Sequence, residues 1–150
     1  MERIQEFETT KEMFLSVPKG GVGVEIGVCK GFNSIGLYHI TKPAKLYLCD
    51  IWEERHPNMG FHEYPELWED DHRELVTKFF RQEIDEGKVE LHKEWGGNFL
   101  YGLENDSLDW VYLDACHDYK PVSIELDNAM CKVKRGGLIM GHDYVANCQV

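Results

Sequence analysis

The chain has few basic residues for its length, and this shortage argues against two classes of partner. Its 150 residues contain 16 Lys and Arg against 27 Asp and Glu, which gives a formal net charge of −11. Nucleic-acid grooves and polybasic membrane anchors both require clustered Lys and Arg, so we expect neither partner. No apolar run approaches the roughly 18 residues of a membrane span. The charged N-terminal stretch also lacks the apolar core of a secretory signal, so we expect a cytoplasmic protein.

Cysteine motifs and phosphate-binding motifs are also missing. The five cysteines stand at positions 29, 49, 116, 131 and 148, without a CxxC pair or the rhythm of a disulfide scaffold. We therefore expect reduced thiols, with Cys49 buried in a strand. The absence of a GxxxxGK[ST] sequence excludes a Walker phosphate loop. There is no internal repeat or linker, and a chain of this length suffices for one core, so we expect a single domain over residues 1–150.

The sequence does contain a regular alternation of short apolar runs and amphipathic stretches. The apolar runs predict strands near 22–28, 45–51, 89–92, 108–113 and 138–140. The stretches between them predict helices near 2–16, 32–40, 65–86, 97–103 and 121–135. We expect Asn33 or Ser34 to cap the second helix and residues 52–64 to form an irregular loop. The apolar side of the last helix should carry Val122, Leu126, Ala129, Met130 and Val133. This alternation predicts an α/β fold, a doubly wound parallel sheet with helices on both faces.

Residues suited to binding a ligand follow the carboxyl ends of the predicted strands, where sheets of this kind bind ligands. Gly27 and Gly31, after the first strand, let a ligand approach the backbone closely, and the helix that follows offers N–H groups to an anion. Asp50 ends the second strand, where a carboxylate accepts the hydroxyls of an unphosphorylated ribose. Together these residues favour a nucleoside-binding site.

The segment 24–33 resembles motif I of class I S-adenosylmethionine-dependent methyltransferases. Its acid, apolar residue, Gly27, three further residues and Gly31 have a spacing similar to that of the catechol O-methyltransferase group. The segment 108–144 resembles the metal-dependent catechol, caffeoyl and macrolide-sugar O-methyltransferases. In that segment Asp114 ends a strand, His117 follows three positions later, and a Gly-Gly strand leads to Asp143. The resemblance covers roughly residues 20–144.

The resemblance implies S-adenosylmethionine as the cofactor. The binding residues that it implies are Glu25, Gly27, Gly31, Asn33, Asp50, Ile51, Trp95 and Gly97. Glu25 would lie near the methionine amino group, and the two glycines of motif I and Asn33 would line the methionine and its carboxylate. Asp50 would hold both ribose hydroxyls. Ile51 would pack on the adenine, whose edge the segment 95–97 would form.

The resemblance also implies a divalent metal, Mg²⁺ or another such ion, and a catalytic base. Asp114 and Asp143 would hold the metal, with His142 or Tyr144 as the third ligand. In the related enzymes Mg²⁺ holds both oxygens of a vicinal diol and lowers the pKa of the oxygen that attacks, whereas a histidine ligand suits Zn²⁺, Mn²⁺ or Fe²⁺ better. His117 would take the hydroxyl proton, so the implied catalytic pair is His117 and Asp114.

We therefore expect methyl transfer to a hydroxyl of a small-molecule acceptor, such as a sugar or a polyketide. Two other functions stay open: a non-catalytic nucleoside-binding or interaction module on the same fold, and an NAD-linked oxidoreductase, which Asp50 suits but the glycine spacing does not. Complete folds of the family continue with a helix and an antiparallel hairpin, so we expect either a C-terminally truncated domain or a minimal variant. An uncovered sheet edge would favour association of copies into a homo-oligomer.

Overall fold

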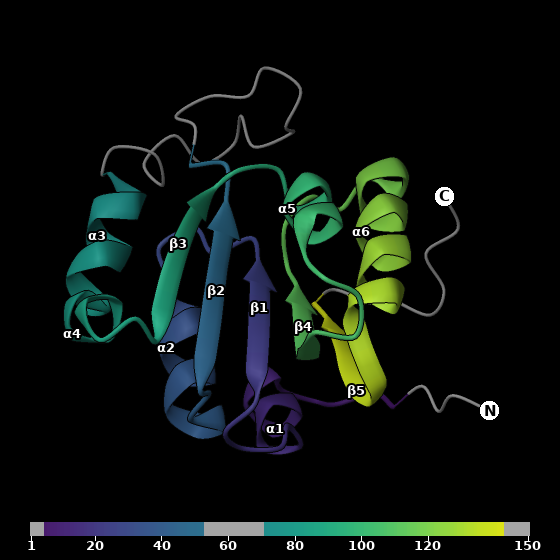
Figure 1. Cartoon of the computed structure of the whole chain (residues 1–150), viewed down its shortest axis with the longest axis horizontal. Helices are drawn as coiled ribbons and strands as arrows, with labels where there is room; N and C mark the ends of the chain where they lie inside the picture. The colour runs from purple at the N-terminus through teal and green to yellow at the C-terminus, as the bar shows by residue number, and fades with distance from the viewer. Residues whose placement is uncertain (1–4, 53–70, 143–150) are drawn as a thin grey trace.

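Five strands form one parallel sheet in the computed structural model, which describes residues 5–52 and 71–142. The strands are β1 (Val22–Ile26), β2 (Lys45–Asp50), β3 (Val89–Lys93), β4 (Leu108–Leu113) and β5 (Val133–Gly141). Their order across the sheet is β3-β2-β1-β4-β5, and every neighbouring pair is parallel. The direction in which strands are added reverses between β1 and β4 (Figure 1). The predicted doubly wound α/β fold is therefore confirmed.

Helices cover both faces of this sheet, as predicted (Figure 1). They are α1 (Thr10–Leu15), α2 (Phe32–Thr41), α3 (His72–Phe79), α4 (Arg81–Asp85), α5 (Gly96–Gly102) and α6 (Tyr119–Lys132). Side chains of α1, α2 and α3 pack in one core cluster with Leu46 and Leu48 of β2. Side chains of α5 and α6 pack in a second cluster with Val24 and Ile26 of β1. Each face of the sheet therefore carries its own core.

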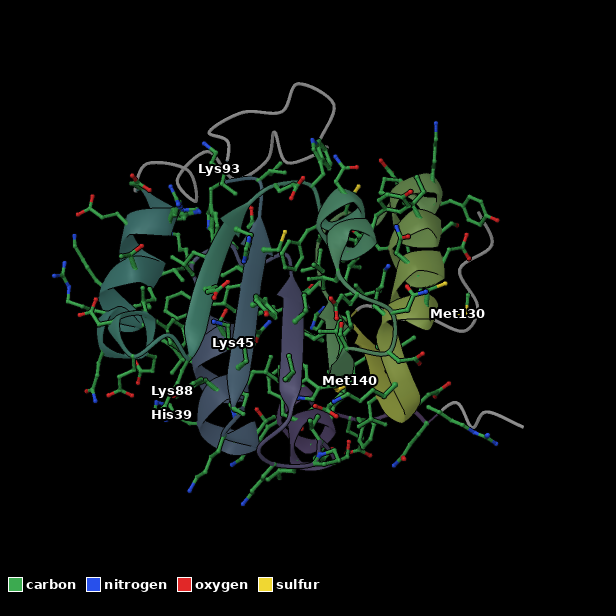
Figure 2. The ribbon with its side chains drawn as sticks, viewed as in Figure 1. His39, Lys45, Lys88, Lys93, Met130 and Met140 are labelled. Atoms are coloured by element: carbon green, nitrogen blue, oxygen red, sulfur yellow. The ribbon has the colours of Figure 1, made fainter. Side chains whose placement is uncertain are left out.

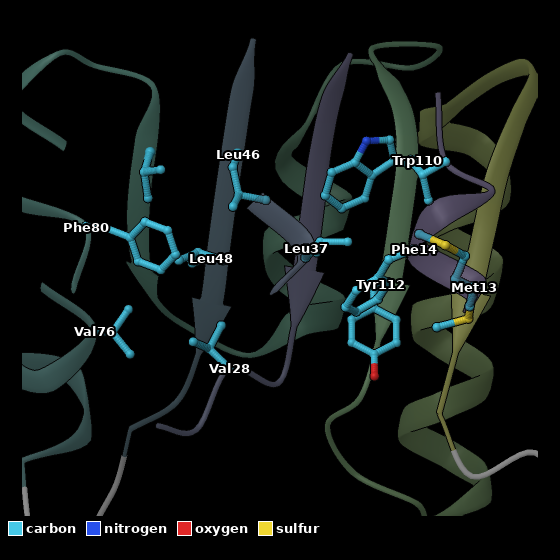
Figure 3. Packing of buried hydrophobic residues seen from close by; sticks show 13 residues of the cluster. Met13, Phe14, Val28, Leu37, Leu46, Leu48, Val76, Phe80, Trp110 and Tyr112 are labelled. Atoms are coloured by element: carbon cyan, nitrogen blue, oxygen red, sulfur yellow. The ribbon is translucent and has the colours of Figure 1, made fainter. Parts of the chain in front are cut away.

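The two cores follow from the alternation of side chains along each strand. Trp110 and Tyr112 of β4 are fully buried on the α1 and α2 side, and the Tyr112 ring meets Phe14 edge-on at 5.2 Å between ring centroids. Figure 3 shows the Tyr112 hydroxyl directed toward the carboxyl ends of the strands. Gly23 on β1 leaves the room for the indole, because a Cβ there would lie 2.0 Å from Trp110. Glu25, between Val24 and Ile26, faces the same side as this aromatic pair.

The first two helices differ from the prediction at their starts. Residues 5–9 are not helical, and α1 begins at Thr10, after the Thr9 hydroxyl that accepts the N–H of Glu12. The predicted caps of α2 are wrong, because its N-cap is Gly31, in the left-handed conformation and without a side-chain cap. Asn33 and Ser34 lie inside the helix and point to the sheet edge described below. A left-handed glycine therefore starts α2 where a polar cap was expected.

The long predicted helix 65–86 is divided into α3 and α4. The two helices meet at Phe80, whose backbone leaves the helical region with φ −108° and ψ 18° while its side chain is buried in the core. Asp71 caps α3 by accepting the N–H of Glu74. The start of the predicted helix, and all of the predicted loop 52–64 except Trp52, lie outside the described residues.

The last predicted helix begins two residues earlier than predicted, and its predicted apolar side is buried only in part. α6 ends at Lys132 and passes directly into β5, so that the Gly-Gly pair at 136–137 lies within the strand. Leu126 and Met130, predicted as core, are exposed, and Figure 2 shows Met130 on the outer side of the helix. Ala129, predicted on the same side, is buried, together with Glu125 and Lys132, which were not predicted there. No helix within residues 5–52 and 71–142 is long and apolar enough to cross a membrane.

Candidate functional site

The carboxyl ends of β1, β2 and β4 lie side by side, because the strands are adjacent and parallel. This border of the sheet, formed by strand ends, is called the sheet edge below. The loop between β1 and α2 crosses this edge. Its Gly27 has φ +90°, and a Cβ there would lie 2.1 Å from the carbonyl oxygen of Asp114. Gly31 has φ +80°, and a Cβ there would lie 2.9 Å from Val76. Both predicted glycines are therefore required by backbone conformation and by close packing.

Asp50, at the end of β2, holds this loop through backbone hydrogen bonds. One carboxylate oxygen accepts the N–H groups of Val28 and Cys29, each at 2.8 Å. The other oxygen accepts the N–H of Trp52, also at 2.8 Å. The Trp52 indole in turn donates to the carbonyl of Cys29 at 3.1 Å. Asp50, which was predicted to bind the ribose, therefore anchors the chain around it.

Glu25, near the end of β1, differs from Asp50 in that it accepts no backbone N–H group. The residue is fully buried, and neither carboxylate oxygen has a hydrogen-bond partner among the described residues. The hydroxyl of Ser34 on α2 is buried and unpaired in the same part of the chain. Burial raises the pKa of Glu25 to about 8; the nearby Ser34 hydroxyl opposes this rise, and the charges of Asp114 and Asp50 add to it. No described residue lies within hydrogen-bond geometry of the Glu25 carboxyl, and the Ser34 hydroxyl is the side chain close enough to lower its pKa.

Asp114, just after β4, belongs to a polar network that the sequence only partly indicates. Its Oδ2 accepts a hydrogen bond from the Tyr112 hydroxyl at 3.0 Å and another from the Asn33 amide at 3.1 Å. These two donors fix one carboxylate oxygen, and the other oxygen, Oδ1, lies 3.7 Å from Nδ1 of His142. The sequence analysis missed Tyr112, although residues two apart on a strand share a face and the hydroxyl therefore had to approach Asp114.

The predicted catalytic and metal-binding residues are only partly assembled in the described chain. The Nδ1 atom of His142 lies 3.7 Å from Oδ1 of Asp114. Asp143 and Tyr144 fall outside the described residues, and within 5–52 and 71–142 no three His, Cys, Asp or Glu side chains form a group that could hold a metal. His117 is exposed, just before Asp118, the N-cap of α6.

The predicted adenine edge lies next to the end of β2. The N–H of Glu94 donates to the carbonyl of Asp50 at 3.1 Å, and the thiol of the buried Cys49 donates to the carbonyl of Glu94 at 3.3 Å. These bonds bring Trp95, which is 43% exposed, and the start of α5 to the same sheet edge. Ile51 is partly buried there and Gly97 packs against α6, where a Cβ would lie 2.9 Å from Ile124.

Comparison with known proteins identifies the domain type. A family profile described as a methyltransferase domain matches residues 24–144. A presumed S-adenosyl-L-methionine-dependent methyltransferase from Methanococcus maripaludis has the same fold, with a TM-score of 0.60 and 14% identity over 88% of this chain. The chain spans about half of that protein, 53% of its length. No curated protein sequence matches the chain.

Two further solved structures have this fold. An rRNA methylase from Streptococcus thermophilus has a TM-score of 0.59 and 12% identity, over 89% of this chain and 69% of its own. A presumed methyltransferase from Streptococcus mutans, solved in complex with S-adenosylhomocysteine, has a TM-score of 0.58 and 12% identity, over 89% of this chain and 73% of its own. At such identities the likeness concerns the fold, and the site has to be argued from its own residues.

Proposed function

The chain belongs to the family of methyltransferase domains, and we propose that it binds S-adenosylmethionine and transfers its methyl group to a hydroxyl of a small-molecule acceptor. The observation that carries this proposal is the Glu25 carboxyl, fully buried and unpaired among the described residues. An unpaired buried carboxyl is unfavourable, so a donor supplied by a ligand explains why it is kept. The α-ammonium group of S-adenosylmethionine is such a donor.

The neighbouring residues support the rest of the cofactor. A carboxylate has roughly four acceptor positions, and Asp50 already accepts three backbone N–H groups. We therefore assign one ribose hydroxyl to Asp50, where the sequence predicted two. We place the methionine carboxylate beside the Asn33 amide, which donates to Asp114 at 3.1 Å and more weakly to the Tyr112 hydroxyl at 3.5 Å. Gly27 brings the ends of β1 and β4 together beside these residues, because the Asp114 carbonyl fills the space of its missing Cβ.

The chemistry asks the protein for alignment and for removal of a proton. S-Adenosylmethionine supplies a methyl group that its sulfonium charge already activates. We assign proton removal to His117, three residues after Asp114, because an imidazole can accept a hydroxyl proton near neutral pH. We place the acceptor on the side of Asp114 where its Oδ1 atom lies 3.7 Å from Nδ1 of His142.

A divalent metal is a separate part of this proposal. Oδ1 of Asp114 and the His142 imidazole are close enough to share one ion, with Asp143 as the third ligand. Mg²⁺ or another divalent ion there would bind the acceptor oxygens and lower the pKa of the hydroxyl that attacks. Because His142 supplies a nitrogen, we expect Mn²⁺ or Zn²⁺ to bind more tightly than Mg²⁺.

Titration calorimetry with S-adenosylhomocysteine tests the cofactor half of the proposal. We expect saturable binding of one molecule per chain, and no binding of NAD at the same concentrations. Failure of S-adenosylhomocysteine to bind the folded protein would refute the proposal. Binding of NAD instead would favour an oxidoreductase.

Transfer of a labelled methyl group to a panel of small hydroxylated compounds tests the second half, with Mg²⁺, with Mn²⁺ and with a chelator. For any accepted compound, we expect His117→Ala to lower turnover roughly 100-fold or more, as for loss of a general base, while S-adenosylhomocysteine affinity is kept. His39→Ala, at an exposed position of α2, is the matched control and should be fully active (Figure 2). Turnover unaffected by His117→Ala would exclude His117 as the base.

A further inference from the structure

Trp52 follows the last residue of β2 by two positions and has no role in the cofactor site as proposed so far. Its side chain is partly buried, and its indole N–H donates to the carbonyl of Cys29 at 3.1 Å. Its backbone N–H donates to Oδ1 of Asp50 at 2.8 Å. The same residue therefore contacts both the acid assigned to the ribose and the loop between β1 and α2.

Cys29 is held on both sides of its Cα atom. Its N–H donates to Oδ2 of Asp50 at 2.8 Å, and its carbonyl accepts the indole N–H of Trp52. Because these bonds fix the planar peptide groups before and after residue 29, they fix both of its backbone dihedral angles. Asp50 and Trp52 thus close a ring of hydrogen bonds with Cys29, in which one Asp50 oxygen binds Cys29 and the other binds Trp52.

The conformation held in this way is one that a cysteine rarely adopts. Cys29 has φ +49°, in the left-handed region, where a Cβ lies too close to the following carbonyl oxygen. Trp52 is left-handed as well, with φ +38°. Such residues persist only where the surrounding structure holds them, and they gather at ligand sites. Release of the Cys29 carbonyl would let residue 29 relax to a negative φ and would turn its N–H away from Asp50.

The start of α3 contacts the same two residues. The guanidinium carbon of Arg73 lies 6.0 Å from the centroid of the Trp52 ring. A cation over an indole face is attracted to it, so Arg73 favours the ring position from which the indole N–H reaches Cys29. The Cys29 sulfur lies 3.8 Å from Nδ1 of His72. This thiol contact is separate from the indole hydrogen bond, and an experiment has to distinguish the two.

We propose that Trp52 is a positioning residue: its indole N–H keeps Cys29 left-handed, and Asp50 thereby keeps the orientation in which it accepts a ribose hydroxyl of the cofactor. This inference rests on the proposed function. A carboxylate has roughly four acceptor positions, and three of those of Asp50 are occupied by backbone N–H groups. These three donors set the direction of the remaining position, so a shift of Cys29 would turn it away from the ribose.

Two ligands that differ only in the ribose test this inference by titration calorimetry. The wild-type protein should bind S-adenosylhomocysteine about 10- to 100-fold more tightly than its 2′,3′-dideoxy analogue, as expected for a hydrogen bond to a charged group. Trp52→Phe keeps an aromatic ring without the indole N–H and should reduce this preference to about threefold or less, because Asp50 is no longer preorganised. Trp110→Phe, in the core on β4, is the matched control: it should lower stability and keep the wild-type preference.

A second substitution at Cys29 separates positioning from loss of packing. Glycine adopts the left-handed conformation without steric cost, so Trp52→Phe combined with Cys29→Gly should recover most of the wild-type preference. Trp52→Phe combined with Cys29→Ala is the matched control, because alanine also loses the thiol contact with His72 but keeps the Cβ. This variant should stay at the low preference of Trp52→Phe. A merely structural tryptophan would give no rescue that depends on the Cβ of residue 29.

The outcomes separate this inference from the proposed function. If S-adenosylhomocysteine does not bind the wild-type protein, the proposed function itself fails. If it binds, the role of Trp52 is overturned by equal wild-type affinity for the two ligands, by a full preference in Trp52→Phe, or by equal recovery with glycine and with alanine at position 29. Should Trp52→Phe fail to fold, the combination with Cys29→Gly should fold and show the preference, and the combination with Cys29→Ala should not. Identical behaviour of the two combinations would overturn the inference.

Discussion

Two carboxyl groups end neighbouring strands at the same sheet edge and have opposite surroundings. Asp50 accepts three backbone N–H groups and thereby fixes the loop between β1 and α2. Glu25 is fully buried and accepts none from the described chain. The first acid holds the chain around it, and the second is the acid that we propose binds the cofactor. A position at a strand end is therefore a weaker sign of a binding residue than hydrogen-bonding capacity that the chain leaves unused.

Gly27→Ala should disturb the surroundings of both acids, because Gly27 follows the strand that carries Glu25 and lies in the loop that Asp50 holds. The added methyl would lie 2.1 Å from the carbonyl oxygen of Asp114, and the backbone has φ +90°. We expect a loss of about 3 kcal/mol or more in the free energy of unfolding, measured by chemical denaturation. Gly20→Ala is the control: its φ is +84° but the space around it is open, so strain alone should cost about 1 kcal/mol. Equal losses would contradict the packing argument.

Asp50→Ala should affect stability and cofactor binding together. The variant leaves three backbone N–H groups without their acceptor, and we expect a loss of about 2–3 kcal/mol, with a large loss of S-adenosylhomocysteine affinity. The control is Asp109→Ala, which removes a carboxylate that accepts the N–H of Val22 at the opposite edge of the sheet. Denaturation and calorimetry should show that Asp109→Ala lowers stability and leaves affinity unchanged. Unchanged stability in Asp50→Ala would refute its role as an anchor.

Glu25→Gln should separate cofactor binding from stability. We expect S-adenosylhomocysteine affinity to fall about 10- to 100-fold, the usual range for one hydrogen bond to a charged group. The free energy of unfolding near pH 6 should change by less than about 1 kcal/mol, because Glu25, with a pKa of about 8, is protonated there and resembles the amide. A strong loss of stability with unchanged affinity would show that Glu25 stabilises the protein and does not bind the cofactor.

The pH dependence of stability tests the burial of Glu25 and Glu125 separately from ligand binding. Burial raises the pKa of Glu25 to about 8 and that of Glu125 to about 7, from a usual value of 4.5. Between these limits the unfolded chain has released protons that the folded chain keeps, so stability falls as the pH rises from 5 to 8. Each group contributes at most about 1.4 kcal/mol per pH unit. In denaturation curves at several pH values, Glu25→Gln and Glu125→Gln should each flatten this decline, and an unchanged slope would contradict the burial of that group.

The fold could be predicted from sequence because its signals are local and repeated. Short apolar runs separated by amphipathic stretches predicted all five strands, and the alternation predicted the parallel sheet. Helix details depended on tertiary contacts and were less predictable. The buried face of α6 was predicted correctly at Ala129 and wrongly at Leu126 and Met130, which are exposed, while Glu125 is buried.

The site was predictable in its positions and less so in its contacts. Strand ends located Glu25, Asp50 and Asp114, because parallel strands bring their carboxyl ends to one edge. Spacing along the chain did not reveal that backbone amides occupy Asp50, or that Tyr112 and Asn33 share one oxygen of Asp114. These contacts depend on how the loop between β1 and α2 folds back over the sheet edge.

The affinity of the protein for S-adenosylhomocysteine and for the same molecule without its α-amino group tests the assignment of Glu25 most directly. In the wild-type protein, removal of the amino group should weaken binding about 10- to 100-fold by calorimetry, because the buried carboxyl loses its partner. In Glu25→Gln, the two ligands should bind with nearly equal affinity. An equal loss in both proteins would show that the amino group binds elsewhere and would contradict the account.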